Sequence, residues 1–148
     1  MSEKTKKPSD DKFARGMRTA TVADIPLLVS MMQRFHKAKD PRFDFHAPSA
    51  AAFIEGIMIS GVVFMTDAGF IAGVKAPAAT NAAYITAHEI GWWAEDRSGW
   101  KLREAFEEWA SDCDAIEFSH PENEKTVGAM LDRAGYVPAT TVWRKICA

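Results

Sequence analysis

The first part of the chain carries two helical patterns of hydrophobic positions. Residues 21–24 fit a capping box, and the apolar side chains after them recur every three or four residues, which predicts a helix. Its apolar face consists of Ile25, Leu28, Val29, Met32, Phe35 and His36. A loop rich in rings follows at residues 39–46. A second helix is predicted from Pro48 to Gly61, and its inner side chains are Phe53, Ile54, Ile57 and Met58.

The middle of the chain has the patterns of strands. Residues 17–20 form a short strand before the first helix, and the apolar runs 62–66 and 70–74 predict a β-hairpin. We expect Gly69 to take the left-handed position of its turn. A long run rich in aromatic and β-branched residues, 83–94, predicts a further strand. From Gly99 the apolar spacing becomes that of a helix.

The last third of the chain repeats the change from a strand pattern to a helix pattern over shorter segments. Residues 115–119 predict a short strand, and a helix from Pro121 to about Ala134 follows, closed by Gly135 at its C′ position. Residues 136–137 and 141–146 predict the final strands. Consecutive strands in the middle, with helices before and after them, indicate an α+β domain whose helices pack on a mixed, mostly antiparallel sheet.

Composition adds the domain boundaries and excludes several function classes. A chain of 148 residues fits one domain, which we place at residues 17–148 after a disordered, charged tail at residues 1–16. The net charge of -2 gives no footprint for nucleic acid, and two cysteines make no disulfide framework. No apolar run is long enough to cross a membrane, and no secretory signal is present, so we expect a cytoplasmic protein.

The candidate chemistry lies in residues 83–110, a strand, a polar turn and the start of a helix. Free N–H groups at a helix N-terminus bind anions. Glu89 is the one acidic residue in the strand. Half-buried, it would have a raised pKa and suit proton transfer, whereas on the exposed face it would be an ordinary solvated or paired carboxylate. Side chains alternate along a strand, so His88 points away from Glu89 unless a bulge, for example at Gly91, intervenes.

With this order of elements, the chain from about Met17 to Ile146 resembles the GCN5-related N-acetyltransferase (GNAT) family. The segment Arg18-Thr-Ala-Thr-Val-Ala-Asp24-Ile-Pro-Leu-Leu is similar to the family's first strand and helix start. The segment Leu131-Asp-Arg-Ala-Gly135-Tyr136-Val-Pro is similar to its last helix and the following strand. Residues 83–110 correspond to its fourth strand, pyrophosphate loop and third helix. The resemblance implies a sheet of about 6–7 strands splayed between strands 4 and 5, with about four helices.

The resemblance also implies binding of acetyl-CoA as co-substrate, with no metal. By analogy with the family, the cofactor-binding residues are Trp92, Trp93, Ala94, Arg97, Ser98, Gly99, Trp100 and Lys101. The family's loop has the pattern Gln/Arg-x-x-Gly-x-Gly/Ala. Counted from Arg97, this sequence places Trp100 and Leu102 where the family has small residues. A tryptophan does not let the backbone approach an anion as glycine does. The loop therefore either binds in a modified way or has lost the cofactor.

The remaining roles follow from the same resemblance. Glu89 resembles the strand-borne glutamate that acts as general base, and a substrate-binding carboxylate is the alternative. His120 is a candidate acid or substrate contact, unless this corner only caps the next helix, most naturally through Ser119. The family's usual tyrosine acid is replaced by Leu131, and we expect Tyr136 to fill the core. Substrate-binding candidates from the loop between the first two helices are Phe43, Phe45 and His46, whose alternative is packing onto the sheet. Cys113, on the inner face of a helix end, does not suit a nucleophile, so we expect direct transfer without an acetyl-enzyme.

The function implied is acetyl-CoA-dependent N-acetylation of a primary amine. The acceptor stays open among polyamines, amino acids, drug amines, and the N-terminus or lysines of proteins. The alternative is a non-catalytic structural or interaction protein on the same scaffold. No nucleic acid or membrane partner is expected, and the exposed edges of the sheet make a homodimer an open expectation.

Overall fold

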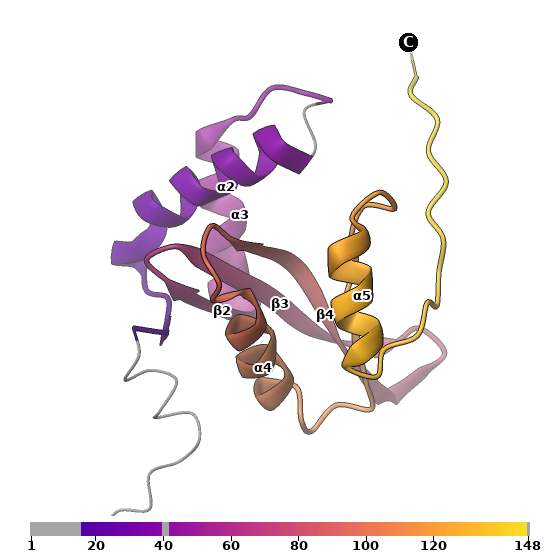
Figure 1. Cartoon of the computed structure of the whole chain (residues 1–148). Coiled ribbons are helices and arrows are strands. Elements are labelled where there is room, and N and C mark those ends of the chain that lie inside the picture. The colour runs from indigo at the N-terminus through magenta and orange to yellow at the C-terminus, as the bar shows by residue number, and fades with distance from the viewer. Residues whose placement is uncertain (1–15, 40–41, 148) are drawn as a thin grey trace, which may run out of the picture.

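The fold combines four α-helices with a five-stranded sheet among the residues that the structure describes, 16–39 and 42–147. It is a computed structural model of the whole chain (Figure 1). The elements in chain order are β1 (Arg18–Thr19), η1 (Val22–Asp24), α2 (Ile25–Lys39), α3 (Ala47–Ser60), β2 (Gly61–Thr66), β3 (Gly69–Ala78), β4 (Asn81–Ala94), α4 (Gly99–Trp109), β5 (Ala115–Glu117) and α5 (Lys125–Arg133). The expected tail at residues 1–16 lies, apart from Gly16, outside the described residues.

The strands lie in the order of the chain, β1-β2-β3-β4-β5. All neighbours are antiparallel except β4 and β5, which are parallel. This last pair is short: it joins Thr86–His88 to Ala115–Glu117, while β4 continues to Ala94. Beyond His88 the two strands therefore diverge. The mixed, mostly antiparallel sheet with a splay between strands 4 and 5 is confirmed, with fewer strands than the 6–7 expected.

The missing strands are those predicted at residues 136–137 and 141–146. Within the described part of the chain, residues after α5 are in neither strand nor helix. They run away from the body of the domain, as the yellow trace in Figure 1 shows. Their β-branched and aromatic side chains do favour a strand, but a strand needs a neighbour with which to pair its backbone. The prediction was wrong because local pattern does not supply that neighbour.

Helices cover both faces of the sheet. In Figure 1, α4 and α5 lie on the near face, and α2 and α3 lie on the other side. One buried cluster centres on Phe106 and Leu102 of α4 against Ile71 and Ala87 of the sheet. The second joins Leu28 and Met31 of α2 and Ile54 and Ile57 of α3 to the opposite face. Met31 is fully buried although the predicted face omitted it, and Phe53, predicted inside, is 51% exposed.

The hairpin between β2 and β3 forms as predicted, but for a different reason. Thr66 pairs with Gly69 across a two-residue turn. Gly69 does not have a positive φ, so the expectation of a left-handed glycine was wrong. A Cβ at Gly69 would instead lie 2.7 Å from the backbone oxygen of Trp93. The glycine is therefore needed because β4 passes close to the hairpin end.

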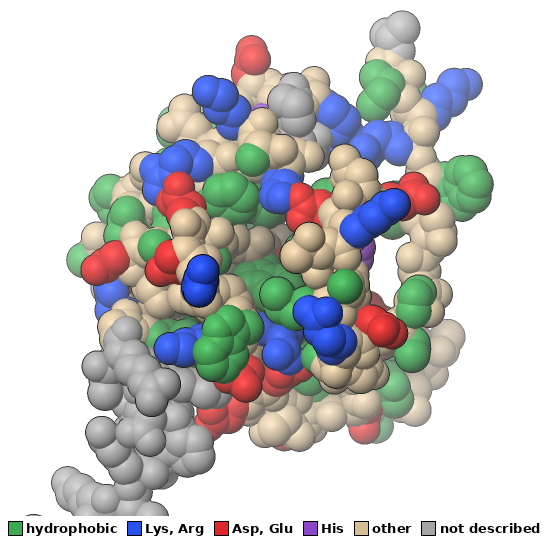
Figure 2. Space-filling model, in the orientation of Figure 1, with side chains coloured by type: hydrophobic (Ala, Val, Ile, Leu, Met, Phe, Trp, Pro, Cys, Tyr) green, Lys and Arg blue, Asp and Glu red, His purple; other side chains and the backbone are tan. Residues whose placement is uncertain are grey.

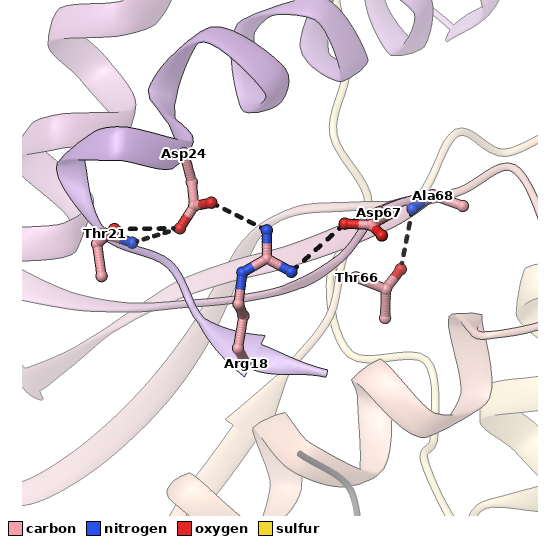
Figure 3. A network of polar contacts seen from close by, with 6 residues as sticks. All are labelled: Arg18, Thr21, Asp24, Thr66, Asp67 and Ala68. Carbon is pink, nitrogen blue, oxygen red and sulfur yellow. Dashed lines mark hydrogen bonds and ion pairs between the residues drawn. The ribbon is translucent and has the colours of Figure 1, made fainter. Parts of the chain in front are cut away.

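A polar network ties this turn to the start of α2 (Figure 3). The Arg18 guanidinium donates to Asp24 at 2.9 Å and to Asp67 of the turn at 3.4 Å. Asp24 also accepts the backbone N–H of Thr21 at 2.9 Å, which is the reciprocal half of the predicted capping box. These hydrogen bonds lower the pKa of Asp24, the Thr21 N–H first and the Arg18 guanidinium second. The network fixes the entry to α2, the helix that borders the cleft.

The last helix is shorter than expected. It begins at Lys125, not at Pro121, and Ser119 does not cap it. Its C-terminal end is as predicted: Gly135 has a φ of +92°, and the Tyr136 N–H donates to the Leu131 carbonyl at 3.0 Å. Of the residues that precede the helix, Pro121 and Glu124 line the cleft described below.

Candidate active site

A cleft of about 490 Å³ opens where β4 and β5 diverge. Five regions of the chain meet there: the C-terminal end of α2, the second half of β4 with the following turn, the first turn of α4, the segment after β5, and α5. The lining residues are Phe35, Lys39, Glu89, Trp92, Trp93, Ala94, Asp96, Arg97, Gly99, Trp100, Ser119, His120, Pro121, Glu124, Val127 and Met130. Figure 2 shows a hollow with a hydrophobic floor on this face, with basic side chains around it.

Glu89 lies at the point of divergence. It is the first residue of β4 beyond the last β4–β5 pair, and it is 9% exposed. Its Oε1 accepts the backbone N–H of Ser119 at 3.1 Å, across the splay. Burial raises the pKa of Glu89 to about 7, and the single N–H donor offsets this only in part. The carboxylate is therefore close to half-ionised at neutral pH, which suits a group that takes up and releases a proton.

A β-bulge in β4 determines what shares a face with Glu89. Gly73 pairs with Glu89 and Ala72 with Gly91, so Ile90 is the extra residue. As a consequence Glu89 and Trp92 both face α4, although they are three residues apart. Trp93 faces α2 and lies edge-on to Phe35, with ring centroids 5.7 Å apart. The bulge was expected beside this position, but His88 stays on the other face, where its Nδ1 lies 3.2 Å from Glu117.

Gly73, opposite the bulge, permits this arrangement. A Cβ at Gly73 would lie 2.2 Å from Cε1 of Phe106 and 2.6 Å from the backbone oxygen of His88. Phe106 therefore packs directly on the backbone of β3, which brings α4 close to the strand that carries Glu89. The same helix presents its N-terminus to the cleft.

The N-terminus of α4 is partly filled by its own chain. Asp96 accepts both the backbone N–H of Ser98 at 2.9 Å and the Ser98 hydroxyl at 2.5 Å. These two hydrogen bonds lower the pKa of Asp96, so it is an anion at neutral pH. The N–H of Gly99 and that of Trp100 have no backbone or side-chain acceptor among the described residues. An incoming anion at this helix end thus meets two N–H groups and one fixed carboxylate.

The residues predicted to bind the cofactor divide into two groups. Trp92, Trp93, Ala94, Arg97, Gly99 and Trp100 line the cleft, whereas Ser98 and Lys101 do not. Lys101 lies over the ring of Trp100, 5.4 Å from its centroid. The indole N–H of Trp92 donates to the Gly99 carbonyl at 3.0 Å, which ties β4 to the first turn of α4. Trp100 is 45% exposed and stands where a small residue was expected.

His120 lines the cleft on the side of α5. Its Nδ1 lies 2.8 Å from the Pro121 carbonyl. A carbonyl oxygen only accepts, so Nδ1 carries the proton and Nε2 is the free ring nitrogen. Gly128 of α5 faces this ring, since a Cβ there would lie 3.4 Å from Nε2. Ser119, expected as a helix cap, contributes its N–H to Glu89 instead.

Sequence reasoning missed the residues of α2 that join the walls of the cleft to each other. Lys39 of α2 forms an ion pair with Glu124, which precedes α5, and lies 5.8 Å from the centroid of the Trp93 ring. The pair connects the two walls of the cleft. Arg34 makes two hydrogen bonds to Glu95, at 2.8 and 2.7 Å, and so ties α2 to the turn after β4. The sequence pattern placed Arg34 outside the apolar face of the helix and Lys39 in the following loop, whereas Lys39 is the last residue of α2. No local signal indicated the partners of either residue.

The three substrate candidates from the loop before α3 lie outside the cleft lining. Phe43 and Phe45 pack against His36, with ring centroids 4.8 and 5.8 Å away. His46 is the N-cap of α3 and accepts the Ser49 N–H at 3.2 Å. These contacts are among local residues of α2, the loop and α3. The residues of α2 that do line the cleft are Phe35 and Lys39.

Three groups considered for other chemical roles are engaged elsewhere. The Tyr136 hydroxyl donates to Glu107 at 2.7 Å, its ring packs on Phe118, and burial raises its pKa. Leu131, at the position of the family's acid, is 7% exposed. Cys113 packs against the core near Phe106, and burial raises the pKa of its thiol. Neither Cys113 nor Tyr136 lines the cleft.

The described residues contain no group of three His, Cys, Asp or Glu side chains arranged to hold a metal ion. None of the helices between residues 16 and 147 combines the length and the apolar character that crossing a membrane requires.

Solved structures with the same fold include named acetyltransferases. A protein from Agrobacterium tumefaciens strain C58 assigned as an acetyltransferase has a TM-score of 0.68 at 16% identity, covering 88% of this chain and 99% of its own. AAC(6')-Iy in complex with the bisubstrate analogue CoA-S-monomethyl-acetylneamine has a TM-score of 0.64 at 13% identity, covering 88% and 97%. A transcriptional regulator from Bacillus halodurans C-125 has a TM-score of 0.69 at 16% identity, covering 88% and 98%.

No family model matches the sequence, and no curated protein matches it. At these identities the likeness concerns the fold. The fold is that of the GNAT acetyltransferases.

Proposed function

We propose that this GNAT-fold chain is an acetyl-CoA-dependent N-acetyltransferase that transfers the acetyl group directly to a primary amine. The observation that carries the proposal is the buried carboxylate of Glu89, with a pKa of about 7, at the splay of β4 and β5 in a cleft of about 490 Å³. A cleft of this size suits a small ligand or the reactive end of a larger one. The bisubstrate analogue in the AAC(6')-Iy complex contains CoA.

The reaction requires a neutral amine next to the thioester. Primary amines are protonated near pH 7, so the ammonium first gives a proton to the Glu89 carboxylate, directly or through water. The amine nitrogen then attacks the acetyl carbonyl, the C–S bond breaks, and the nitrogen loses its second proton to water or to the departing thiolate as the amide forms. The thiolate leaves without strong assistance, because thiols ionise at about pH 8.5. His120 is the group of this chain placed to protonate it, through Nε2 after a change of tautomer or through water.

The chain also offers groups for the CoA pyrophosphate. The N–H groups of Gly99 and Trp100, the dipole of α4 and the Arg97 side chain all favour an anion. Asp96 opposes it, because its carboxylate already accepts the N–H of Ser98. The residues fit a pyrophosphate only if Asp96 turns away or if the pyrophosphate lies toward Arg97.

That opposition supports a second candidate, a non-catalytic protein on the same scaffold. In that case Asp96 stays hydrogen-bonded to Ser98, the residue before α4, and the cleft no longer holds acetyl-CoA. Glu89 would then be a buried carboxyl that is protonated below about pH 7.

Thermal unfolding with acetyl-CoA separates the two candidates. A ligand at 100 times its Kd adds about 2.7 kcal/mol to the free energy of unfolding. We expect a clear rise in Tm with acetyl-CoA, and then release of free CoA thiol with one class of a panel of amines: a polyamine, free amino acids, an aminoglycoside and lysine peptides. No rise in Tm at millimolar acetyl-CoA would reject the enzyme and leave the non-catalytic candidate.

A further inference from the structure

The ammonium group of Lys39 occupies a small cation-binding site inside the cleft. Its Nζ lies 5.8 Å from the centroid of the Trp93 ring and is paired with the Glu124 carboxylate. An aromatic ring and a carboxylate around one ammonium are the ordinary elements of such a site. We propose that this site, the Lys39 subsite formed by Trp93 and Glu124, receives a second ammonium group of the acceptor, and that the acceptor is a linear diamine or polyamine.

Glu124 is directed to the Lys39 subsite although its position offers another use. It is the N-cap of α5, where a side-chain oxygen commonly accepts an N–H of the first turn. Its side chain makes no such hydrogen bond and pairs across the cleft with Lys39 of α2 instead. The side chain of Glu124 is 22% exposed and that of Lys39 is 26% exposed. The carboxylate is therefore placed to bind a cation in the cleft and not to cap its own helix.

An ammonium group of the acceptor can replace that of Lys39 with little loss. The exchange leaves the Glu124 carboxylate paired and the Trp93 ring in contact with a cation, and it returns the flexible Lys39 side chain to water. A partly exposed ion pair contributes little to stability by itself, so its rearrangement costs little. Lys39 thus fills the subsite in the free protein and is displaced by a ligand that carries the same group.

The group that occupies the Lys39 subsite also indicates the shape of the ligand. A lysine side chain is an unbranched chain of methylenes that ends in a primary ammonium. Apolar side chains share the cleft with it: the Phe35 ring lies edge-on to Trp93, with centroids 5.7 Å apart, and Val127 and Met130 of α5 are part of the lining. A linear polyamine offers methylenes to these walls, whereas an aminoglycoside carries its ammonium groups on hydroxylated rings.

The charges that line the cleft also favour a dication. Asp96 and Arg97 belong to the turn before α4, and the other Asp, Glu, Lys and Arg side chains of the lining are Lys39, Glu89 and Glu124. Once Lys39 has left the subsite, Glu89 takes a proton from the reacting amine and Glu124 holds the second ammonium. A free amino acid would bring its own carboxylate toward these two groups. This proposal deepens the proposed N-acetyltransferase and rests on it for the reaction, but not for binding.

The first test measures binding alone, by calorimetric titration of spermidine, cadaverine and n-pentylamine into the protein without acetyl-CoA. Cadaverine and n-pentylamine have chains of the same length, with two ammonium groups and one. We expect the polyamines to bind roughly tenfold more tightly than the monoamine. Glu124→Gln should remove that preference, whereas Glu122→Gln, an exposed residue outside the cleft lining, should keep it. Equal binding of all three amines, or a preference that survives Glu124→Gln, overturns the proposal.

The second test removes the present occupant of the subsite. Lys39→Ala empties the Lys39 subsite, so spermidine and cadaverine should bind roughly threefold more tightly to this variant than to the wild type. Lys37→Ala, at an exposed residue of the same helix outside the cleft lining, should leave their binding unchanged. Unchanged or weaker binding to Lys39→Ala would mean that the Lys39 ammonium is not displaced by the ligand, and would overturn the exchange of ammonium groups.

Turnover with acetyl-CoA separates this proposal from the function on which it rests. The kcat/KM for spermidine and cadaverine should exceed that for n-pentylamine roughly tenfold, and Glu124→Gln should raise KM for the polyamines with little change in kcat. No CoA release with any amine, together with polyamine binding that requires Glu124, would reject the acetyltransferase and keep the subsite. Turnover of n-pentylamine with the same kcat/KM as cadaverine would keep the acetyltransferase and reject the subsite.

Discussion

The two halves of the cleft, the corner around Glu89 and the N-terminus of α4, are built by different means. Glu89 owes its raised pKa to burial, and one backbone N–H, from Ser119, orients it. The α4 N-terminus depends on the open N–H groups of Gly99 and Trp100, and Asp96 already takes the N–H of Ser98 beside them. The proton-transfer site is thus created by burying a carboxyl group, whereas the anion site is created by leaving backbone N–H groups without acceptors. A single side chain is enough to occupy such an anion site.

The largest effect, on turnover, is expected from a substitution of the buried Glu89. Glu89→Gln keeps an oxygen for the Ser119 N–H but removes the base, so turnover should fall by roughly 10²- to 10⁴-fold. The Tm shift with acetyl-CoA should stay, because the substitution lies away from the α4 N-terminus. Glu117→Gln is the matched control, a β5 carboxylate outside the cleft lining, and should leave turnover unchanged. Full activity of the Glu89 variant would remove Glu89 as base.

The same substitution should change the pH dependence of stability. The folded-state pKa of Glu89, about 7, exceeds the ordinary 4.5, so the folded protein holds the proton more tightly than the unfolded chain. Wild-type stability should therefore fall between about pH 4.5 and pH 7 and stay lower above it. Glu89→Gln escapes this loss, which amounts to about 3 kcal/mol.

Denaturant unfolding at pH 5 and at pH 8 measures the effect. The difference in stability between variant and wild type should favour the variant more at pH 8 than at pH 5. A difference that is the same at both pH values would show that Glu89 titrates near its ordinary pKa.

At the N-terminus of α4 the expected effect is smaller, and it is a gain in affinity for acetyl-CoA. Asp96→Asn keeps an oxygen acceptor for the Ser98 N–H but removes the negative charge, so the affinity for acetyl-CoA should rise roughly tenfold. Calorimetric titration gives the Kd, and Asp132→Asn on α5 controls for the change in net charge. An unchanged Kd would place the pyrophosphate away from the α4 N-terminus.

The smallest effect is expected from an exposed side chain at this corner. Arg97→Ala should weaken acetyl-CoA binding about threefold, and the difference should shrink at high salt, because exposed charge pairs are weak and screened. Arg133→Ala, at the far end of α5, is the control. A loss of more than a hundredfold would mean that the Arg97 side chain, and not the helix N-terminus, holds the anion.

The sequence predicted most of what local pattern determines. The helices, the hairpin, the long strand and the Gly135 helix end follow from periodicity and from residues with special backbone preferences. Glu89 was singled out because a lone acidic residue in an apolar strand is conspicuous, and its role as a base stays a prediction.

The remainder depends on contacts between distant parts of the chain. The ion pair of Lys39 with Glu124 and the Ser119 N–H on Glu89 join residues with no sequence relation. The strands predicted within residues 136–146 are absent for the same reason: the pattern favours an extended backbone but does not show which strand it would pair with. Phe43, Phe45 and His46 looked like a substrate loop because rings in a loop are conspicuous, yet their described contacts are local.

The extra residue Ile90 sets the parity of β4. Upstream of it, odd-numbered side chains face α4; downstream of it, even-numbered ones do, as Trp92 shows. Deleting Ile90 would remove the bulge and leave the faces of its neighbours unchanged, because Glu89 would still pair with Gly73 and Trp92 with Ile71. A strand of the same length without the bulge would instead turn Trp92 toward α2 and Trp93 toward α4. A comparison of this strand with another sequence, residue by residue, is therefore meaningful only if the bulge is counted as a shift in phase.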